Sequence, residues 1–342
     1  MKVALAAKKD APEATGRHQA GMGQVLRLIR SGERFMIACH RRPDADALGS
    51  ALGFAAILRA LGKETKVFVP DELPLNLRFL ACGDIKREIG ADERYDAVFV
   101  MDTAATELLP DGLPNEDVRG PLVIVDHHAS HDDVGDVVVR DIKACATAEV
   151  VMDIAESLDV LPVPKEAATP LYAAIVADTG GFRYPSTRSR VLRMGADLID
   201  QGADPWNVAY ELFEGWPQER VRLLGEVLDS LQLFFDGRYA QLIVTREMLE
   251  RVGATDEMIE GMVNYGRMLR GVEAAALLWE FEGKTGIEAR LSLRSRDDID
   301  VGKVAASLGG GGHRSAAGAT IREPIAAAAE RVRDAFASDV FG

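Results

Sequence analysis

The clearest chemical signal in this chain is the consecutive triplet Asp126, His127 and His128. It follows directly on residues 121–125, a short apolar run typical of a buried strand. Two imidazoles and a carboxylate at the end of a strand are costly to bury unless they are paired or bind a cation. The same groups are common ligands of divalent metal ions. The triplet therefore indicates a metal site.

The same residue types follow an earlier apolar run, residues 34–39. His40, Asp44 and Asp46 stand between that run and a helix expected at residues 47–61. Open α/β sheets bind their ligands in the loops beyond the carboxyl ends of the strands. This spacing therefore predicts that one imidazole and two carboxylates lie at the carboxyl edge of a sheet.

Two further carboxylates end apolar segments. Asp102 follows the run 97–101, and Asp178 comes at the end of an apolar helix. A single Asp in such a place is more often a turn residue or a helix N-cap, and Asp46 could be such a cap. Four segments that each end in Asp or His are hard to obtain from capping preferences alone. Oxygen and nitrogen ligands without a thiolate favour Mn²⁺ or Mg²⁺ over structural zinc, and the imidazoles favour Mn²⁺. The candidate ligands are His40, Asp44, Asp46, Asp102, His127 and Asp178.

The helices and strands that must position these side chains are predicted to form an α/β fold. Short apolar runs alternate with helical stretches up to about residue 200, which is the pattern of a parallel sheet covered by helices on both faces. Strands are expected at 34–39, 65–69, 97–101 and 121–125, and helices at 22–29, 47–61, 147–158 and 166–176.

A different pattern begins near residue 233. Longer alternating runs at 239–245, 274–281 and 286–294, separated by helices, predict a second, smaller α+β domain. A length of 342 residues suits two domains at roughly 150 residues each. We expect a flexible tail at 1–18, a first domain at 19–203, a helical connector at 204–231 and a second domain at 232–342.

Composition excludes several classes of protein. The chain has no apolar run near the roughly 18 residues that span a bilayer, and its N-terminus lacks the apolar core of a signal peptide. Cys39, Cys82 and Cys145 are odd in number and unclustered, which predicts reduced thiols in a cytoplasmic protein. A net charge of −14 argues against a protein that coats long nucleic acids. A small anionic substrate remains compatible with this charge, provided that cations lie at its site.

The second domain carries four consecutive glycines at 309–312, followed by His313, Arg314 and Ser315. Such a run lets backbone N–H groups approach an anion closely, and the three polar side chains add donors. The alternative is a flexible linker or a tight turn, but the polar residues that follow at once favour phosphate recognition. Arg294 adds a guanidinium to that site or is an exposed cation at a strand end, and both interpretations stay open.

In this order and spacing, the motifs resemble the DHH family of phosphoesterases that carry a DHH-associated C-terminal domain. The branch they resemble most is that of the oligoribonucleases that also act as pAp phosphatases (nanoRNases). An Asn often found three residues after the second histidine of the triplet is His131 here, and an Arg common shortly after Asp102 is absent. Both departures leave the substrate preference open. The matching residues are His40, Asp44 and Asp46; Asp102, Thr103 and Ala104; Asp126, His127 and His128; Asp178, Thr179 and Gly180; Ser292, Leu293, Arg294 and Ser295; and residues 309–318.

The resemblance implies two divalent ions, with Mn²⁺ expected first and Mg²⁺ or Co²⁺ as alternatives. Asp126 would orient the histidines, and His128 would face the scissile phosphate. The second domain would close over the active-site cleft between the domains. One ion would be held by His40, Asp44 and Asp102, and the other by Asp46, Asp102, His127 and Asp178; Arg294, Gly311, Gly312, His313, Arg314 and Ser315 would bind a substrate phosphate.

The implied activity is the metal-dependent degradation of short RNA oligonucleotides to 5′-mononucleotides, together with removal of the 3′-phosphate of pAp. The alternative within the family is a phosphodiesterase for cyclic dinucleotides or pApA. A third hypothesis is a non-catalytic nucleotide sensor, which the full ligand set disfavours. A homodimer is expected from the resemblance alone. His131, Asp132 and Asp133 are expected to form a solvated loop without a role.

Overall fold

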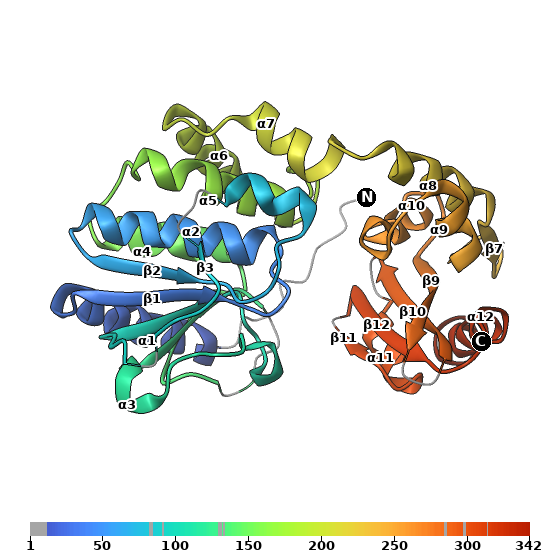
Figure 1. Ribbon diagram of the computed structural model, residues 1–342, viewed down its shortest axis with the longest axis horizontal. Helices are drawn as coiled ribbons and strands as arrows, with labels where there is room; N and C mark the ends of the chain where they lie inside the picture. The colour runs from blue at the N-terminus through green and yellow to red at the C-terminus, as the bar shows by residue number, and fades with distance from the viewer. Residues whose placement is uncertain are drawn as a thin grey trace, which may run out of the picture. The chain divides into compact units, whose positions relative to one another are not determined.

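The computed structural model describes residues 12–342, apart from residues 82–84, 91, 129–131, 133, 284–285, 297–298 and 313. It consists of two compact units, Met1–Gly215 and Trp216–Gly342. Each unit is built around its own six-stranded sheet (Figure 1). The α/β and α+β classes expected for the two parts of the chain are confirmed.

The sheet of the first unit is parallel throughout. Its strand order is β3-β2-β1-β4-β5-β6. The chain first adds β2 and β3 on one side of β1 and then adds β4, β5 and β6 on the other side, so the order in which strands are added reverses between β1 and β4. This reversal is the place where doubly wound sheets bind their ligands. The strands are β1 (Arg34–Cys39), β2 (Glu64–Phe68), β3 (Ile85–Lys86), β4 (Ala97–Met101), β5 (Leu122–Asp126) and β6 (Val137–Arg140).

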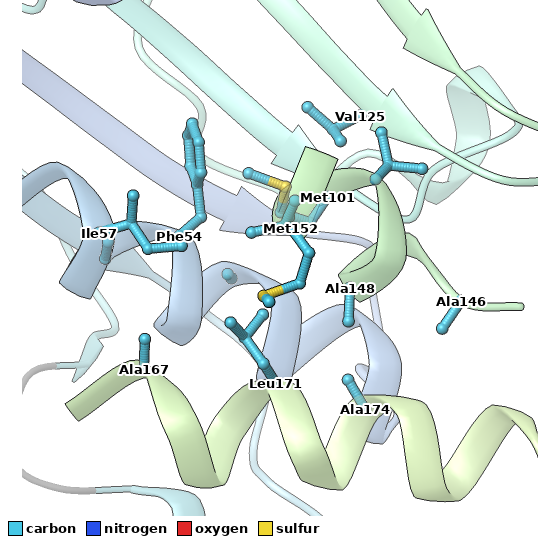
Figure 2. Packing of buried hydrophobic residues seen from close by; sticks show 14 of the residues in the cluster. Phe54, Ile57, Met101, Val125, Ala146, Ala148, Met152, Ala167, Leu171 and Ala174 are labelled. Carbon is cyan, nitrogen blue, oxygen red and sulfur yellow. The ribbon is translucent and has the colours of Figure 1, made fainter. Parts of the chain in front are cut away.

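Helices α2 and α4 lie along one face of this sheet, and α5 packs on the outer side of α2 (Figure 1). Phe54 of α2 and Leu171 of α5 point into the same apolar cluster as Met101 at the end of β4, as Figure 2 shows. Alternate strand residues, such as Met36 and Val98, pack in a separate cluster on the opposite face. The helices are α1 (Pro12–Ser31), α2 (Ala45–Ala60), α3 (Glu116–Arg119), α4 (Thr147–Ser157), α5 (Lys165–Asp178), α6 (Ser189–Asp200) and α7 (Pro205–Ala209), with 3₁₀ turns at Leu75–Leu80 and Thr106–Leu108 and a π-helical turn at Tyr210–Glu214.

Small residues let α2 and α5 pack closely. A Cβ at Gly49 would lie 2.3 Å from the carbonyl oxygen of Pro170, and one at Gly53 would lie 2.4 Å from the side chain of Leu171. The two helices therefore approach backbone to backbone. This close packing holds α5, which ends at Asp178, in place against α2.

The second unit holds a mixed sheet in the order β11-β12-β10-β9-β8-β7, in which only the described pair β8–β9 is parallel. One face packs on α11 and α12, with Tyr239 and Phe336 at the centre. The other face packs on α8, through Leu223 and Val227. The elements are α8 (Gln218–Asp229), β7 (Gln232–Phe234), β8 (Tyr239–Val244), α9 (Arg246–Val252), α10 (Val263–Arg267), β9 (Ala274–Gly283), β10 (Gly286–Ser295), α11 (Val301–Ser307), β11 (Gly311–Gly312), β12 (Ala316–Ile321) and α12 (Ile325–Phe336), with a 3₁₀ turn at Asp256–Ile259 and a π-helical turn at Ala337–Phe341.

Two segments differ from the sequence expectation. Helix α1 begins at Pro12, so residues 12–18 of the expected tail are helical, and residues 1–11 lie outside the described residues. Proline is tolerated in the first turn of a helix, because its missing N–H would have no partner there. The expected connector 204–231 is divided, since Val208 of α7 packs in the core of the first unit while α8 packs in the second. Within the described residues, none of the helices combines the length and apolarity needed to cross a membrane.

Candidate metal centre

The candidate metal ligands of the first unit meet at one edge of its sheet. His40 follows β1, Asp102 follows the neighbouring strand β4, and Asp126 ends β5, the next strand along. All three strands are parallel and in register, with Cys39 opposite Met101. Their carboxyl ends therefore lie side by side, at the point where the strand order reverses.

The first ligand group is His40, Asp44 and Asp102, whose ligand atoms lie within 4.8 Å of one another. The Nε2 atom of His40 is 3.8 Å from Oδ1 of Asp44 and 3.6 Å from Oδ2 of Asp102. Its Nδ1 atom is 2.8 Å from the carbonyl oxygen of Arg41. A carbonyl oxygen only accepts, so Nδ1 carries the hydrogen and the lone pair of the neutral ring is on Nε2, directed at the carboxylates.

The second ligand group is Asp46, His127 and Asp178. The Nε2 atom of His127 is 3.7 Å from Oδ2 of Asp46, 3.2 Å from Oδ2 of Asp178 and 3.6 Å from Oδ1 of Asp102. Its Nδ1 atom donates to the carbonyl oxygen of Ala144 at 3.3 Å. Asp102 thus presents Oδ1 to the second group and Oδ2 to the first, which is the arrangement of a carboxylate that bridges two ions.

These distances fit ligands of a shared cation better than hydrogen bonds. A normal N–H···O hydrogen bond is about 2.9 Å long. Two ligands that are each about 2.1 Å from one ion lie about 3.0 Å apart at a right angle and about 3.4 Å apart at a tetrahedral angle. The separation of 3.2 Å between Nε2 of His127 and Asp178 lies in this range, and the other four separations from Nε2 atoms to carboxylate oxygens, 3.6–3.8 Å, are slightly longer than it and clearly longer than a hydrogen bond. The two groups therefore have the donor types that divalent metal ions need, at separations near those of ligands that share one ion.

Asp102 reaches this position through an unusual backbone conformation. Its φ of 59° lies in the left-handed region, which Asp tolerates better than most residues with a side chain. Its N–H donates to the carbonyl oxygen of Val125 at 2.8 Å, and its side chain is buried. Strained residues of this kind concentrate at functional sites, where the surrounding structure holds them in place.

The amino end of α4 holds the buried carboxylate of Asp46. Asp46 accepts hydrogen bonds from the backbone N–H groups of Thr147, at 2.6 Å, and Ala148, at 3.1 Å, and from the hydroxyl of Ser50 at 2.9 Å. The first N–H groups of a helix have no partner within the helix, and the helix dipole favours an anion there. This interaction stabilises a carboxylate that burial alone would disfavour.

Thr147 is a site residue that the sequence did not reveal. Its hydroxyl donates to Oδ1 of Asp102 at 2.8 Å, so the residue contacts a ligand of each group. A Thr at the start of a predicted helix looks like an ordinary N-cap, and only the fold shows that its hydroxyl points elsewhere. Asp46 is also not the N-cap residue of α2, a role that the sequence allowed for it. Asp44 is the N-cap, since its side chain accepts a hydrogen bond from Ala47 N–H at 2.9 Å.

The charges of the two groups favour a bound cation. Burial raises the pKa of Asp46 well above its usual value, and the negative charges of Asp102 and Asp178 raise it further. Burial lowers the pKa of His127, but its contact with Asp178 and the charges of Asp46 and Asp102 outweigh burial and raise this pKa to about 10. Asp178 also lies at the carboxyl end of α5, where the helix dipole disfavours an anion. A divalent ion would relieve all of these penalties at once.

Asp126 and His128 form a pair, and His128 also belongs to a third possible ligand group, with Asp102 and His127. Nδ1 of His128 is 2.7 Å from Oδ1 of the fully buried Asp126. This contact places the hydrogen on Nδ1 and leaves Nε2 as the reactive nitrogen of His128. His127 is oriented by the carbonyl oxygen of Ala144, which accepts from its Nδ1. That Asp126 orients both histidines stays a prediction.

The glycine run of the second unit is an edge strand. Gly311 and Gly312 form β11, which pairs with Gly318 and Ala317 of β12. A Cβ at Gly310 would lie 2.1 Å from the carbonyl oxygen of Gly318, whereas a Cβ at Gly311 would meet nothing within 4 Å. The linker alternative is excluded, because part of the run is held in a sheet by close pairing that requires glycine.

The other candidate phosphate-binding residues lie near this strand. Arg294 of β10 is opposite Ala316 of β12, and Ser295 N–H donates to the carbonyl oxygen of Ser315 at 3.0 Å. The Arg314 backbone is fixed by a hydrogen bond from Val301 N–H at 2.8 Å. The side chains of Arg314 and Ser315 are exposed, while Arg294 is half-buried. His313 and His131 lie outside the described residues.

Comparisons with known proteins bear on both units. Residues 34–175 match the model described as "DHH family, N-terminal domain", and residues 239–339 match the "DHHA1 domain". The chain is 34% identical to the bifunctional oligoribonuclease and PAP phosphatase NrnA of Thermus thermophilus, over 92% of this chain and 91% of that protein. It is 28% identical to the cyclic-di-AMP phosphodiesterase PdeA of Listeria monocytogenes, over 89% of this chain but 47% of that protein. The solved structure of an exopolyphosphatase-related protein from Bacteroides fragilis has the same fold, with a TM-score of 0.83 and 24% identity, and the alignment covers 93% of this chain and 96% of that one.

Proposed function

Because the chain belongs to the DHH family, we propose that it is a metal-dependent phosphodiesterase that degrades short RNA oligonucleotides to 5′-mononucleotides. Removal of phosphate from pAp is part of the same proposal. The observation that supports it most is the position of Asp102, which presents one carboxylate oxygen to each of two ligand groups. A site for two cations at a sheet edge suits the hydrolysis of phosphate esters.

The donor set fits two divalent ions. His40, Asp44 and Asp102 would hold one ion, and Asp46, Asp102, His127 and Asp178 would hold the other. When bound, the two ions would activate a water molecule and neutralise negative charge on the phosphate that it attacks. Imidazole and carboxylate together suit Mn²⁺ best, with Mg²⁺ and Co²⁺ as weaker candidates.

His128 would donate a proton to the leaving oxygen. Burial lowers the pKa of His128, but its hydrogen bond with Asp126 and the charges of Asp102 and Asp126 outweigh burial, so the pKa is raised above its ordinary value. The proton that the leaving oxygen needs would be carried on Nε2, since Nδ1 faces Asp126. When the bond between phosphorus and the 3′-oxygen breaks, that proton would complete the 3′-hydroxyl of the departing nucleotide, and Asp126 would hold the ring in place.

Residues of the second unit would bind the rest of the substrate. The exposed side chains of Arg314 and Ser315, the half-buried Arg294 and the backbone of β11 supply donors for a phosphate. We assign this role to Gly311, Gly312 and His313 as well, in line with the resemblance of the motif. An enzyme that binds one end of its substrate in this way would favour oligonucleotides of a few residues.

The alternative is a phosphodiesterase for cyclic dinucleotides or pApA. The two relatives differ in how completely they match, since the oligoribonuclease aligns over 91% of its length and the cyclic-di-AMP enzyme over 47%. This difference favours the oligoribonuclease activity. A non-catalytic nucleotide sensor is disfavoured by the presence of both ligand groups with His128 beside them.

A product time course with purified protein tests the proposal. RNAs of two to about ten nucleotides, pAp, pApA and c-di-AMP would be offered in parallel, with Mn²⁺ and with a chelator. We expect mononucleotides from the shortest RNAs, no turnover with chelator, and loss of turnover in Asp102→Asn but not in Asp197→Asn, an exposed control on α6. Preferred cleavage of c-di-AMP would support the alternative, and full turnover by Asp102→Asn would refute the assignment of the site.

Location and assembly extend the proposal. A cytoplasmic enzyme is in keeping with Cys39 and Cys145, which are buried free thiols. A homodimer stays a prediction from the resemblance.

A further inference from the structure

A buried carboxylate outside the two ligand groups has no part in the proposed mechanism. Glu149, in the first turn of α4, is 1% exposed, and it accepts a hydrogen bond from the backbone N–H of Cys145 at 2.8 Å. Two guanidinium groups neutralise it: Nη2 of Arg188 at 2.6 Å and Nη1 of Arg190 at 3.1 Å. A buried charge with this many partners is costly to assemble, so its contacts indicate what it stabilises.

One side of this cluster is the segment that contacts the second ligand group. Residues 144–148 orient His127 through the carbonyl oxygen of Ala144, bind Asp46 through two backbone N–H groups, and bind Asp102 through the hydroxyl of Thr147. Cys145, whose backbone N–H donates a hydrogen bond to Glu149, belongs to this same segment. Glu149 therefore fixes a turn of backbone on which three ligands depend.

The other side of the cluster is the segment that follows Asp178. The chain leaves α5 at Asp178, makes a turn closed by a hydrogen bond from Arg183 N–H to the carbonyl oxygen of Thr179 at 2.9 Å, and reaches Arg188 at the start of α6. Arg190, in the first turn of α6, binds Glu149 and also contacts Asp153, one helical turn further along α4. Glu149 thus joins the segment after Asp178 to the segment that holds Asp46.

We propose that Glu149 is a positioning residue for the ion held by Asp46, His127 and Asp178. It would keep these ligands at their separations by tying α4 to the start of α6. It would affect the ion near His40 less, because only the shared ligand Asp102 depends on the same segment. This inference rests on the proposed metal site.

Substitution by Gln separates charge from shape. Glutamine keeps the volume of Glu149 and an oxygen that can accept from Cys145 N–H, but it loses the attraction to both guanidinium groups. Arg188 and Arg190 are 43% and 45% exposed, so they can turn into water instead of remaining as buried unpaired charges. The protein should therefore fold while the link between the two segments is released.

The test is the binding of Mn²⁺ alone, followed by electron paramagnetic resonance and calorimetry. In Glu149→Gln we expect one of two ions to bind about 10- to 100-fold more weakly, which is the size typical for residues that orient metal ligands. The affinity of the other ion should fall by a clearly smaller factor. Arg188→Gln, altered at an exposed side chain, should weaken the same ion. Asp153→Asn is the matched control, because it shares Arg190 but contacts none of residues 144–148, and it should bind both ions normally. Raised Mn²⁺ should restore the turnover of Glu149→Gln.

The possible negative results of this test lead to different conclusions. If the wild type binds two ions and Glu149→Gln and Arg188→Gln bind them equally well, the positioning role is refuted and the proposed function stands. Equal weakening of both ions with a lower midpoint of urea unfolding would show a general structural role and also refute it. If the wild type binds no divalent ion, the proposed function itself fails, and this inference fails with it.

Discussion

The hydroxyl of Thr147 offers the sharpest single test of the site. Thr147→Val removes the hydrogen bond to Oδ1 of Asp102 but keeps the N–H that binds Asp46 and nearly all of the side-chain volume. Thr147 is fully buried and Asp102 is 4% exposed, so water cannot replace the lost donor. A hydrogen bond to a charged group contributes about 1.5–3 kcal/mol, which corresponds to about a 10- to 150-fold change in an equilibrium constant.

We expect this loss in two measurements on Thr147→Val. The free energy of unfolding in urea, measured with chelator present, should fall by about 1.5–3 kcal/mol. The affinity for Mn²⁺ should fall by about 10- to 100-fold, because the bridging carboxylate is no longer held in one orientation.

The chain supplies a matched control for this substitution. The hydroxyl of Thr187 is buried and has no hydrogen-bond partner among the described residues. Thr187→Val should therefore leave both the stability and the Mn²⁺ affinity at or above the wild-type values. If Thr147→Val loses no more than Thr187→Val in either measurement, the argument that this hydroxyl organises Asp102 is wrong.

Three further predictions concern other parts of the molecule. Gly310→Ala places a Cβ 2.1 Å from the Gly318 carbonyl oxygen and should cost about 1–3 kcal/mol of unfolding free energy. Gly311→Ala, with open space around its Cβ, should leave the unfolding free energy unchanged, as urea unfolding of the two variants would show. Two backbone N–H groups at the start of β1 donate hydrogen bonds to Asp96 and lower the pKa of its carboxyl group. The carboxylate therefore stabilises the folded protein above about pH 4, and this stabilisation is lost as the pH falls further. The free energy of unfolding in urea, measured between about pH 3 and 6, should depend less on pH in Asp96→Asn than in the wild type. Chelation should abolish turnover, and added Mn²⁺ should restore the turnover. His128→Ala should still bind Mn²⁺, while its turnover falls by about 100-fold or more. Normal turnover in His128→Ala would exclude His128 as the proton donor.

Much of the fold was predictable because local patterns and tertiary packing agree. Residues 97–101 are uniformly apolar, and residues 34–39 are apolar after the exposed Arg34, as strands buried on both faces must be; they coincide with β4 and β1. Helices were expected over both faces, but the described residues that cover the second face, such as Tyr95 and Val134, come from loops. The short strands β3 and β6 were not expected, because two to four residues carry too little periodicity. The division of residues 204–231 between the units also needed the structure, since it depends on which core each helix buries its apolar face against.

The sequence by itself determined which residue types end the strands, because a polar group after an apolar run must lie at a sheet edge. It therefore determined that acids and imidazoles gather at one edge of the first sheet. Only the tertiary structure decided how they divide into two groups, with Asp102 facing both, and which backbone holds them. Asp46 and the N–H of Thr147 are 101 residues apart in the chain, and Glu149 meets Arg188 across 39. Such contacts leave no local pattern, since they arise where separate elements pack, and they depend on the direction of each side chain as much as on its type.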